Sequence, residues 1–342
     1  MRLLITTQAV DLDDPVLAFF HAWLKEFSTE VESLEVICLK EGRHELPANV
    51  HVHSLGKETG QSRIKYLWRL YGYVWRLRNK YDAVFVHMNP EYFVAAGLLW
   101  NLLNKKTALW YIHPHSSWRL RKALKYADLV FSASKESFPL NTDKLRAVGI
   151  GVDTTFFSPG ELAPSAAARV MCAARIAPVK NVACMIEATD FLVKRHPHLM
   201  FDYYGEELPR DAHYALTMRA KAQAIPAWTF RGKANGEQIR DAYRTHDIHV
   251  NATVSGSFDK AVFEAMACGC ISVASNKALA QILPRELLFE ENDPESLART
   301  IEGVMRLPDV DKAVLRARMR SLAVEHYSLS AVIRKIVTAI AL

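Results

Sequence analysis

Short apolar runs alternate regularly with longer amphipathic segments along this 342-residue sequence. Runs such as 81–87, 170–174 and 248–251 have the length and the valine, isoleucine and phenylalanine content of strands that are buried on both faces. The segments between such runs place their apolar residues at helical spacing. Strands and helices in strict alternation favour an α/β fold built on doubly wound parallel sheets.

The alternation stops once, near the middle of the chain. Residues 155–168 carry two prolines and several small residues without periodicity, which predicts a linker between domains. A chain of 342 residues is also long for one hydrophobic core. We therefore expect domains over residues 1–155 and 156–326. Strands are predicted at 2–6, 34–39, within 44–56, and at 81–87, 107–112, 128–134, 145–148, 170–174, 200–204, 228–230, 248–251 and 270–274.

Composition limits the partners and the compartment. Lys and Arg total 43 against 37 acidic residues, a modest excess of +6 that suits an anionic small molecule or an anionic membrane as well as nucleic acid. The five cysteines are scattered without metal-ligand spacing, which predicts reduced thiols in a cytoplasmic protein. No uncharged apolar segment reaches the roughly 18 residues that a membrane span needs. The first residues predict a strand rather than a secretory signal.

Two stretches are both aromatic and basic, residues 63–80 and 118–125. The first predicts a helix with one apolar face and several arginines elsewhere. Its apolar positions are Leu67, Leu70, Tyr71, Val74 and Leu77, and its basic positions include Arg69, Arg76, Arg78 and Lys80. Such a helix either lies on an anionic membrane, at the inner face of the cytoplasmic membrane, or packs on the domain with its cations in water.

Residues 255–275, SGSFDKAVFEAMACGCISVAS, predict a loop, a short helix, a glycine stop at Gly269 and a buried strand. Gly256, Ser257 and Asp259 are expected to give the helix a flexible start, with the side chains of Ser257 and Asp259 capping it. Glu264 is the one carboxylate in an otherwise apolar helix. It either interacts with the helix dipole or meets a ligand.

Polar residues follow several of the predicted strands, where ligands of parallel sheets bind. Arg175 and Lys180 lie in one loop before a helix, an arrangement that either binds an anion or is simply solvated. Asn89 and His113 follow two strands of the first half, and each could instead cap a turn. Asp11-Leu12-Asp13 has the spacing of a metal site, but capping of a helix that starts at Asp13, Asp14 and Pro15 explains these residues more simply. No metal site is therefore predicted.

Several motifs occur together in one order: AVGIGVDTTFFSP, AARIAPVKN, YYGEELP, FRGKAN, IRDAYRTHDIHVNAT and FDKAVFEAMACGCISVAS. In order and spacing they resemble the retaining glycosyltransferases of family four. The resemblance covers most of residues 80–300 and is most specific from 170 to 275. It implies the GT-B fold, with two Rossmann-like doubly wound domains facing a cleft, and a crossover helix at about 327–342 that returns to the first domain.

The same resemblance implies roles for the matching positions. Arg175 and Lys180 match residues that bind the donor diphosphate, and Glu264 matches the residue that holds the ribose hydroxyls. His113 matches a histidine near the reacting sugar, and Asn89 falls on the acceptor side. The remaining positions expected on the donor side are Gly205, Arg231, Gly232, Gly256, Ser257, Phe258, Asp259 and Lys260.

One position departs from the family pattern. The family has a glutamate eight residues before the one matched by Glu264, and this chain has Gly256 there. Either Asp259 replaces the missing carboxylate, or the donor sugar differs, or activity is impaired. We favour an active enzyme with altered sugar recognition.

The implied activity is hexosyltransferase-like transfer, with retention, from a nucleotide-diphosphate sugar of UDP or GDP type to a hydroxyl of a glycan or lipid-linked acceptor. The product would belong to glycan, glycolipid or cell-envelope polysaccharide synthesis. No metal, no further cofactor and no nucleic acid is expected, and contact with an anionic membrane would be peripheral. A nucleotide-sugar epimerase of the same fold and a catalytically weak nucleotide-sugar-binding protein are the alternatives.

Overall fold

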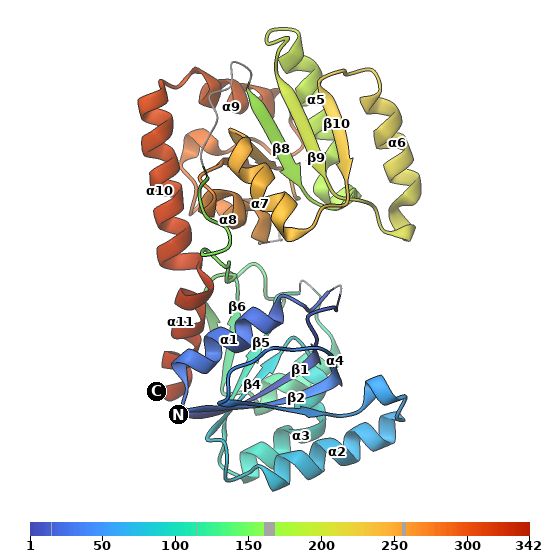
Figure 1. Cartoon of the computed structure of the whole chain (residues 1–342), viewed down its shortest axis with the longest axis vertical. Coiled ribbons are helices and arrows are strands. Elements are labelled where there is room, and N and C mark those ends of the chain that lie inside the picture. Colours follow the sequence, from blue (N-terminus) through green and yellow to red (C-terminus); the bar gives the residue numbers. More distant parts are fainter. Residues whose placement is uncertain (15, 114, 161–167, 255–257) are drawn as a thin grey trace. The chain divides into compact units, whose positions relative to one another are not determined.

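The computed structural model describes residues 1–14, 16–113, 115–160, 168–254 and 258–342, which form two compact units (Figure 1). The first unit comprises Met1–Gly151 together with Leu329–Leu342, and the second comprises Val152–Ser328. Each unit is built on its own parallel sheet with helices on both faces. The predicted α/β class, with two doubly wound domains, is confirmed.

In the described part of the first unit, seven parallel strands form a sheet in the order β3-β2-β1-β4-β5-β6-β7. The strands are β1 (Arg2–Val10), β2 (Ser33–Glu41), β3 (Val50–Ser54), β4 (Ala83–His87), β5 (Lys106–Trp110), β6 (Leu129–Ser132) and β7 (Leu145–Ala147). The helices are α1 (Phe20–Glu30), α2 (Arg63–Arg76), α3 (Pro90–Leu102), α4 (Trp118–Tyr126) and α11 (Leu329–Ala341).

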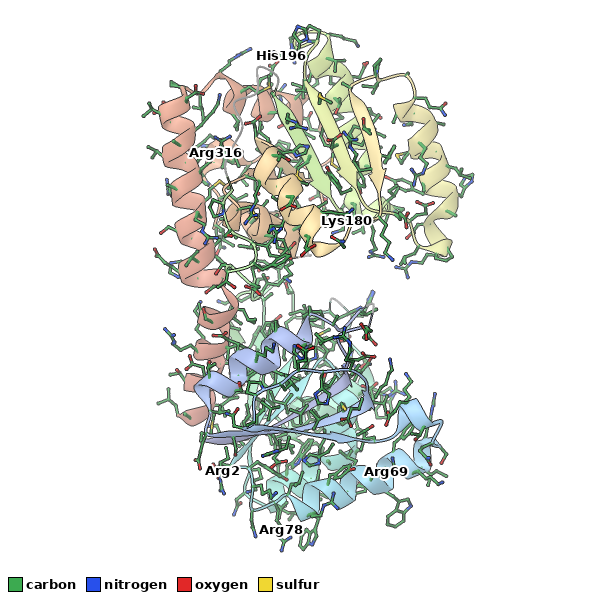
Figure 2. The ribbon with its side chains drawn as sticks, viewed as in Figure 1. Arg2, Arg69, Arg78, Lys180, His196 and Arg316 are labelled. Atoms are coloured by element: carbon green, nitrogen blue, oxygen red, sulfur yellow. The ribbon has the colours of Figure 1, made fainter. Side chains whose placement is uncertain are left out.

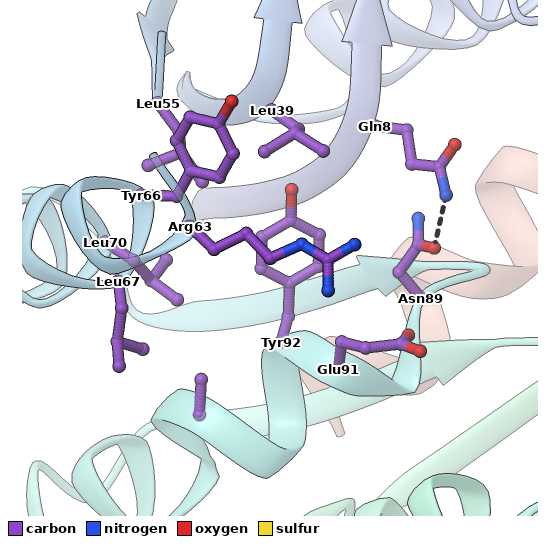
Figure 3. Close-up of a pocket in the computed structure, with 11 residues that line it drawn as sticks. Gln8, Leu39, Leu55, Arg63, Tyr66, Leu67, Leu70, Asn89, Glu91 and Tyr92 are labelled. Carbon is purple, nitrogen blue, oxygen red and sulfur yellow. Dashed lines mark hydrogen bonds between the residues drawn. The ribbon is translucent and has the colours of Figure 1, made fainter. Parts of the chain in front are cut away.

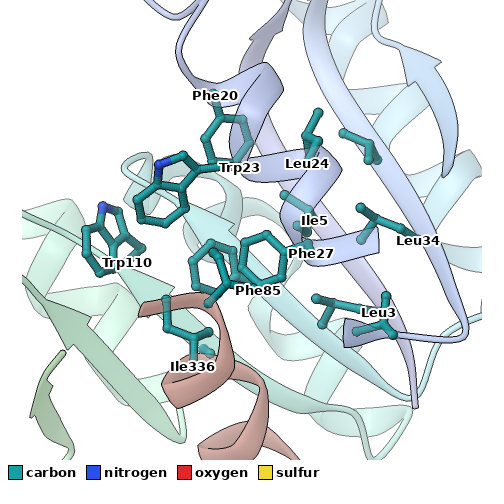
Figure 4. Packing of buried hydrophobic residues seen from close by; sticks show 14 of the residues in the cluster. Leu3, Ile5, Phe20, Trp23, Leu24, Phe27, Leu34, Phe85, Trp110 and Ile336 are labelled. Carbon is teal, nitrogen blue, oxygen red and sulfur yellow. The ribbon is translucent and has the colours of Figure 1, made fainter. Parts of the chain in front are cut away.

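Alternate residues of each strand serve two separate cores, because successive side chains point to opposite faces of a sheet. Leu3 and Ile5 of β1 belong to a core with α1 and α11, whereas Leu4 between them belongs to a core with α2, α3 and α4. Aromatic rings fill the first of these cores, where Trp23 meets Trp110 at 4.9 Å between ring centroids (Figure 4). The strands are therefore buried on both sides, as their continuous apolar runs predict.

The start of the first helix differs from the prediction. β1 continues to Val10 and α1 begins only at Phe20. The Asp14 carboxylate does accept hydrogen bonds from backbone nitrogens, at 2.9 Å from Leu17 N, but it caps the turn over residues 16–19 that leads into α1 rather than the first residues of α1 itself. Pro15, which the same prediction used, lies outside the described residues.

The second unit has a parallel sheet in the order β10-β9-β8-β11-β12 over its described residues. Its strands are β8 (Arg169–Ala173), β9 (Met200–Tyr204), β10 (Trp228–Gly232), β11 (Ile248–Asn251) and β12 (Ile271–Ala274). Its helices are α5 (Val182–Val193), α6 (Ala212–Ala222), α7 (Gly236–Thr245), α8 (Lys260–Ala267), α9 (Pro294–Arg306) and α10 (Asp309–Tyr327).

Both sheets reverse their direction of growth at one point. The reversal lies between β1 and β4 in the first unit and between β8 and β11 in the second. In open α/β sheets, ligands bind outside the carboxyl ends of the strands at such a switch point. Each unit therefore offers one preferred place for a binding site.

Candidate functional site

Two loops meet at the switch point of the second unit, one after β8 and one after β11. The Val254 backbone nitrogen donates to the Val179 carbonyl at 3.0 Å and ties the loops together. Lys180 ends a short 3-10 turn in the first loop, and Asp259 precedes α8 in the second. Figure 2 shows Lys180 at the edge toward which the arrows of β8, β9 and β10 point.

Lys180 and Asp259 form the centre of this site. The Lys180 Nζ lies 2.5 Å from Asp259 Oδ2, and each side chain is only 14% exposed. The Asn251 amide (2.9 Å) and the Thr253 hydroxyl (3.0 Å) donate to the same carboxylate oxygen. Thr253 Oγ1 in turn accepts a bond from Lys180 Nζ at 3.3 Å. The result is a cation held in a fixed position by a hydrogen-bonded network.

This network corrects the expected role of Asp259. The carboxylate makes no hydrogen bond to the start of α8, so it is not the predicted capping side chain. Burial raises the pKa of Asp259, but the charge of Lys180 and the hydrogen bonds from Lys180, Asn251 and Thr253 outweigh burial and leave the pKa below its ordinary value. Asp259 is thus an ionised partner of Lys180, which does not support a direct replacement of the family's missing glutamate by this residue.

Arg175 supplies a second cation in the same loop as Lys180. Its side chain is exposed and makes no hydrogen bond or ion pair within the described residues, while its carbonyl accepts from the Tyr203 hydroxyl at 2.9 Å. One fixed and one exposed cation therefore follow β8, a combination that can neutralise two phosphate groups without a metal.

The helix predicted after this loop is present as α8, and Gly269 beyond it has the left-handed φ of +80°. Glu264 lies on α8 with its side chain 15% exposed and 3.2 Å from Lys260 Nζ. Phe258 stacks on Phe263 and is buried, which indicates a packing role at this position. Gly256 and Ser257 lie outside the described residues.

Gly205 directly follows β9 and Gly232 ends the neighbouring β10, and Gly205 N donates to the Gly232 carbonyl at 2.8 Å. Gly205 has a φ of +137°, and a Cβ atom there would lie 1.9 Å from the Ala174 carbonyl oxygen. The backbone of this strand end can therefore approach the loop after β8 only if residue 205 has no side chain.

Arg231 lies at the end of β10 with its guanidinium turned back along the sheet. Its Nε and Nη2 atoms donate to the two oxygens of Asp202 at 3.0 and 3.1 Å. Asp202 also accepts from His246 at 3.1 Å and is only 2% exposed. A direct contact between Arg231 and a nucleotide base would have to compete with this bidentate ion pair.

The two candidate residues of the first unit lie in separate loops. Asn89 precedes α3, and its Oδ1 accepts from Gln8 Nε2 at 2.7 Å. His113 is exposed after β5, and its Nδ1 accepts from the backbone nitrogen of His115 at 3.3 Å. Asn89 therefore lies at the switch point between β1 and β4, whereas His113 lies one strand farther along the sheet.

Asp11 and Asp13, the carboxylates with the spacing of a metal site, each form an ion pair instead. Asp11 lies 2.8 Å from Lys40 Nζ and Asp13 lies 2.9 Å from Arg43 Nη2. Over the described ranges, no group of three His, Cys, Asp or Glu side chains is placed to hold a metal ion.

Sequence comparison identifies the domain that carries the Lys180 site. Residues 167–306 match the family model of glycosyl transferases group 1. This stretch is a glycosyl transferases group 1 domain. The group 1 domain includes Arg175, Lys180, Asp259 and Glu264, so the predicted assignment to a glycosyltransferase family is confirmed.

Two curated relatives are glycosyltransferases by name. One is a phosphatidylinositol N-acetylglucosaminyltransferase component of Arabidopsis thaliana, 24% identical over 188 residues that cover 54% of this chain and 41% of that protein. The other is a D-inositol 3-phosphate glycosyltransferase of Saccharomonospora viridis, 27% identical over 203 residues that cover 53% of this chain and 46% of the relative. The matches therefore span less than half of either relative.

Solved structures share the fold over the whole chain. Anabaena Alr3699/HepE in complex with UDP superposes with a TM-score of 0.78 at 16% identity, covering 100% of both chains. The same protein with UDP-glucose gives a TM-score of 0.74 at 15% identity, again covering 100% of both chains. At this identity the likeness shows the fold alone, and it supports the predicted GT-B fold of two Rossmann-like domains.

Within the described residues, every helix is too short or too polar to span a bilayer.

Proposed function

We propose that this protein transfers a sugar, with retention of configuration, from a nucleotide-diphosphate sugar to an acceptor hydroxyl. The observation that carries the proposal is Lys180, a partly buried cation held by Asp259 and Thr253 at the switch point of a group 1 domain. Because ligands of such sheets bind at this position, the location of the cation supports a role in binding the donor diphosphate. The exposed Arg175 supplies a second positive charge.

Lys180 has an N–H donor left for a phosphate oxygen. An ammonium group has three N–H donors, and Asp259 and Thr253 accept two of them. Within the described residues no other side chain accepts the third donor, which leaves it for a ligand. In the proposed reaction the acceptor oxygen bonds to the anomeric carbon, the bond from that carbon to the diphosphate breaks, and the acceptor proton passes to the leaving diphosphate. Lys180 and Arg175 then stabilise the charge that develops on the diphosphate.

The donor is proposed to be a UDP or GDP sugar. The UDP and UDP-glucose complexes of Anabaena HepE, which has the same fold, support a uridine donor. Glu264 is the carboxylate proposed to accept two ribose hydroxyls, since both of its oxygens are acceptors when it is ionised. Binding of the ribose would then exchange the contact that Glu264 makes with Lys260 for bonds to the donor.

The acceptor is proposed to be a glycan or lipid-linked molecule met at an anionic membrane, at the inner face of the cytoplasmic membrane. Four of the five exposed large apolar side chains of helix α2 recur at helical spacing, and we name these four the α2 stripe: Ile64 (69% exposed), Trp68 (74%), Tyr71 (38%) and Trp75 (55%). Basic side chains flank it at Lys65, Arg69 and Arg76. Aromatic rings beside cations are typical of helices that bind anionic bilayers peripherally.

Calorimetry with UDP, UDP-glucose and GDP-mannose tests the donor assignment. The wild type and a Lys221→Ala control, altered at an exposed lysine on α6, should bind one of these nucleotides, and Lys180→Ala should not. Equal binding by Lys180→Ala and the control would contradict the proposal.

Incubation with donor alone separates transfer from the alternative activity. An epimerase of this fold would release an altered free sugar and nucleotide without any acceptor. The proposed transferase should instead consume donor in proportion to added acceptor.

A further inference from the structure

The first unit contains a cavity of about 300 Å³ at its own switch point, between the start of α2 and the start of α3 (Figure 3). Gln8 lies near the end of β1 and Asn89 follows β4, and the 2.7 Å hydrogen bond between them closes one end. The position between β1 and β4 is the one where an open α/β sheet binds its ligand. The cavity is therefore the first candidate for a second binding site on this chain.

The lining of the cavity divides into an apolar wall and a polar end. Leucine, alanine and tyrosine side chains form the wall, namely Leu39, Leu55, Tyr66, Leu67, Leu70, Tyr92 and Ala95. Gln8, Asn89, Arg63 and Glu91 form the polar end. Because burying sugar hydroxyls against an apolar wall without hydrogen bonds is costly, this wall suits a hydrocarbon chain rather than a saccharide.

Arg63 gives the polar end its charge. Its guanidinium projects toward the cavity (Figure 3) and makes no hydrogen bond or ion pair within the described residues. Glu91, the neighbouring carboxylate, lies 3.6 Å from Arg119 Nε, so its charge already has a cation beside it. Arg63 is thus placed to pair with an anion that sits above the apolar wall.

Leu67 connects the cavity with the α2 stripe. It lines the cavity, and it is also 43% exposed, which places it at the mouth. Leu67 is adjacent to Trp68 in sequence and one helical turn from Ile64 and Tyr71. A hydrocarbon chain can therefore pass from the stripe into the cavity along a continuous apolar surface.

We propose that this cavity binds the hydrocarbon segment of an anionic amphiphile drawn from the membrane, with its headgroup on Arg63. Identifying that amphiphile as the sugar acceptor rests on the proposed function. The acceptor class is then a lipid with an anionic headgroup that carries the reacting hydroxyl, rather than a free soluble glycan.

Monomeric alkyl phosphates of increasing chain length test the site in the absence of any donor. We expect affinity, measured by calorimetry below the critical micelle concentration, to rise about fourfold for each CH₂ until the cavity is full. Inorganic phosphate should bind at least a hundredfold more weakly than decyl phosphate. Affinity that does not change with chain length would overturn the proposal.

Two pairs of variants locate the binding. Ala95→Phe fills the cavity from α3 and should reduce decyl phosphate affinity at least tenfold, whereas Leu98→Phe adds a ring on the exposed surface one turn away and should leave it unchanged. Arg63→Gln should weaken decyl phosphate but not decanol, and Lys65→Gln should weaken neither. Unfolding curves check that each variant is folded. If Ala95→Phe does not fold, the comparison of Arg63→Gln with Lys65→Gln still tests the site.

These experiments test the cavity independently of nucleotide binding at the donor site. Equal affinity of Ala95→Phe and Leu98→Phe for decyl phosphate would overturn the cavity assignment even if UDP still binds to the second unit. If the wild type binds decyl phosphate but none of UDP, UDP-glucose and GDP-mannose, the proposed function is overturned and the cavity site stands.

Discussion

Lys180 and Asp259 join the two loops at the switch point of the second sheet through a 2.5 Å contact between Nζ and Oδ2. Neither residue has the surroundings of an ordinary surface pair, because both side chains are largely buried and Asp259 accepts from Asn251 and Thr253 as well. Fixing a cation in this way avoids part of the entropy that a free lysine would lose when it binds a phosphate.

Removal of the cation should separate catalysis from stability. Lys180→Ala should lower transfer by about 10²–10³-fold, since a preorganised charge at the leaving group is lost. It should also lower the free energy of unfolding by about 1–3 kcal/mol, because Asp259 keeps only its two neutral donors. Initial rates and urea unfolding measure the two effects. A stable variant with wild-type rates would show that Lys180 does not contact the donor.

The stability that Asp259 supplies should depend on pH. Burial alone would raise the pKa of Asp259, but Lys180, Asn251 and Thr253 lower it below the ordinary value of 3.8. A carboxyl group with a depressed pKa in the folded state stabilises the fold above its unfolded value and loses that contribution as pH falls through the folded value. The difference in unfolding free energy between wild type and Asp259→Asn should therefore be constant near neutrality and shrink below pH 3.8. A difference that grows toward acid pH would contradict the ionised assignment.

Glu264→Gln should weaken the nucleotide and spare the fold. The ion pair with Lys260 is an i,i+4 helix pair, which contributes only about 0.3–0.5 kcal/mol. Loss of charged hydrogen bonds to a ribose should weaken UDP binding by about 10–100-fold. Glu295→Gln, at an exposed site on α9, is the matched control. Calorimetry with UDP compares the two variants, and equal affinities would exclude Glu264 from the nucleotide site.

Arg320 of α10 should prove important for the stability of the second unit. Its guanidinium donates to the carbonyls of Phe157, Ala267 and Thr154, and Ala267 is the last residue of α8. Arg320→Met removes these donors and should cost about 2–4 kcal/mol. Arg320→Lys should recover only part of this loss, because an ammonium cannot reproduce the planar fork. Thermal unfolding ranks the variants, and an unchanged midpoint for Arg320→Met would contradict the prediction.

Membrane binding should depend on the α2 stripe. Trp68→Ala combined with Trp75→Ala should reduce sedimentation with vesicles of phosphatidylserine and phosphatidylcholine by at least tenfold. Wild-type binding should also fall as salt is raised from about 0.1 to about 0.5 M, since the flanking cations are screened. Leu216→Ala, at an exposed leucine of α6, serves as the control. Equal vesicle binding by the wild type, the double variant and Leu216→Ala would contradict a role of the α2 stripe in membrane binding.

The fold was predictable because its signal is local. Buried parallel strands have continuous apolar runs, and each predicted run from 81–87 to 270–274 corresponds to a strand of the structure. The start of α1 was not predicted correctly, since Asp13 pairs with Arg43 rather than capping a helix. That pairing joins residues 30 positions apart and leaves no trace in local spacing.

The site was predictable only in part. Family resemblance pointed to Lys180, Asp259 and Glu264, and the first two do meet in the structure. Asn251 and Thr253 were missed, although their place at the end of a buried strand was a usable signal. The α2 stripe was also missed, because helical periodicity groups Leu67 and Tyr71 with the buried leucines and cannot show which side of the apolar face meets solvent.

Helix α11 has a consequence for the order of folding. It contributes Val332, Ile333, Ile336 and Ile340 to the core of the first unit, although the whole second unit separates it from the rest of that core in sequence. On a ribosome, the second unit is contiguous and can fold as soon as it emerges, whereas the first must wait with an apolar face of its sheet uncovered. The unit that is synthesised first is thus the one completed last, and until then it is the natural client of a chaperone.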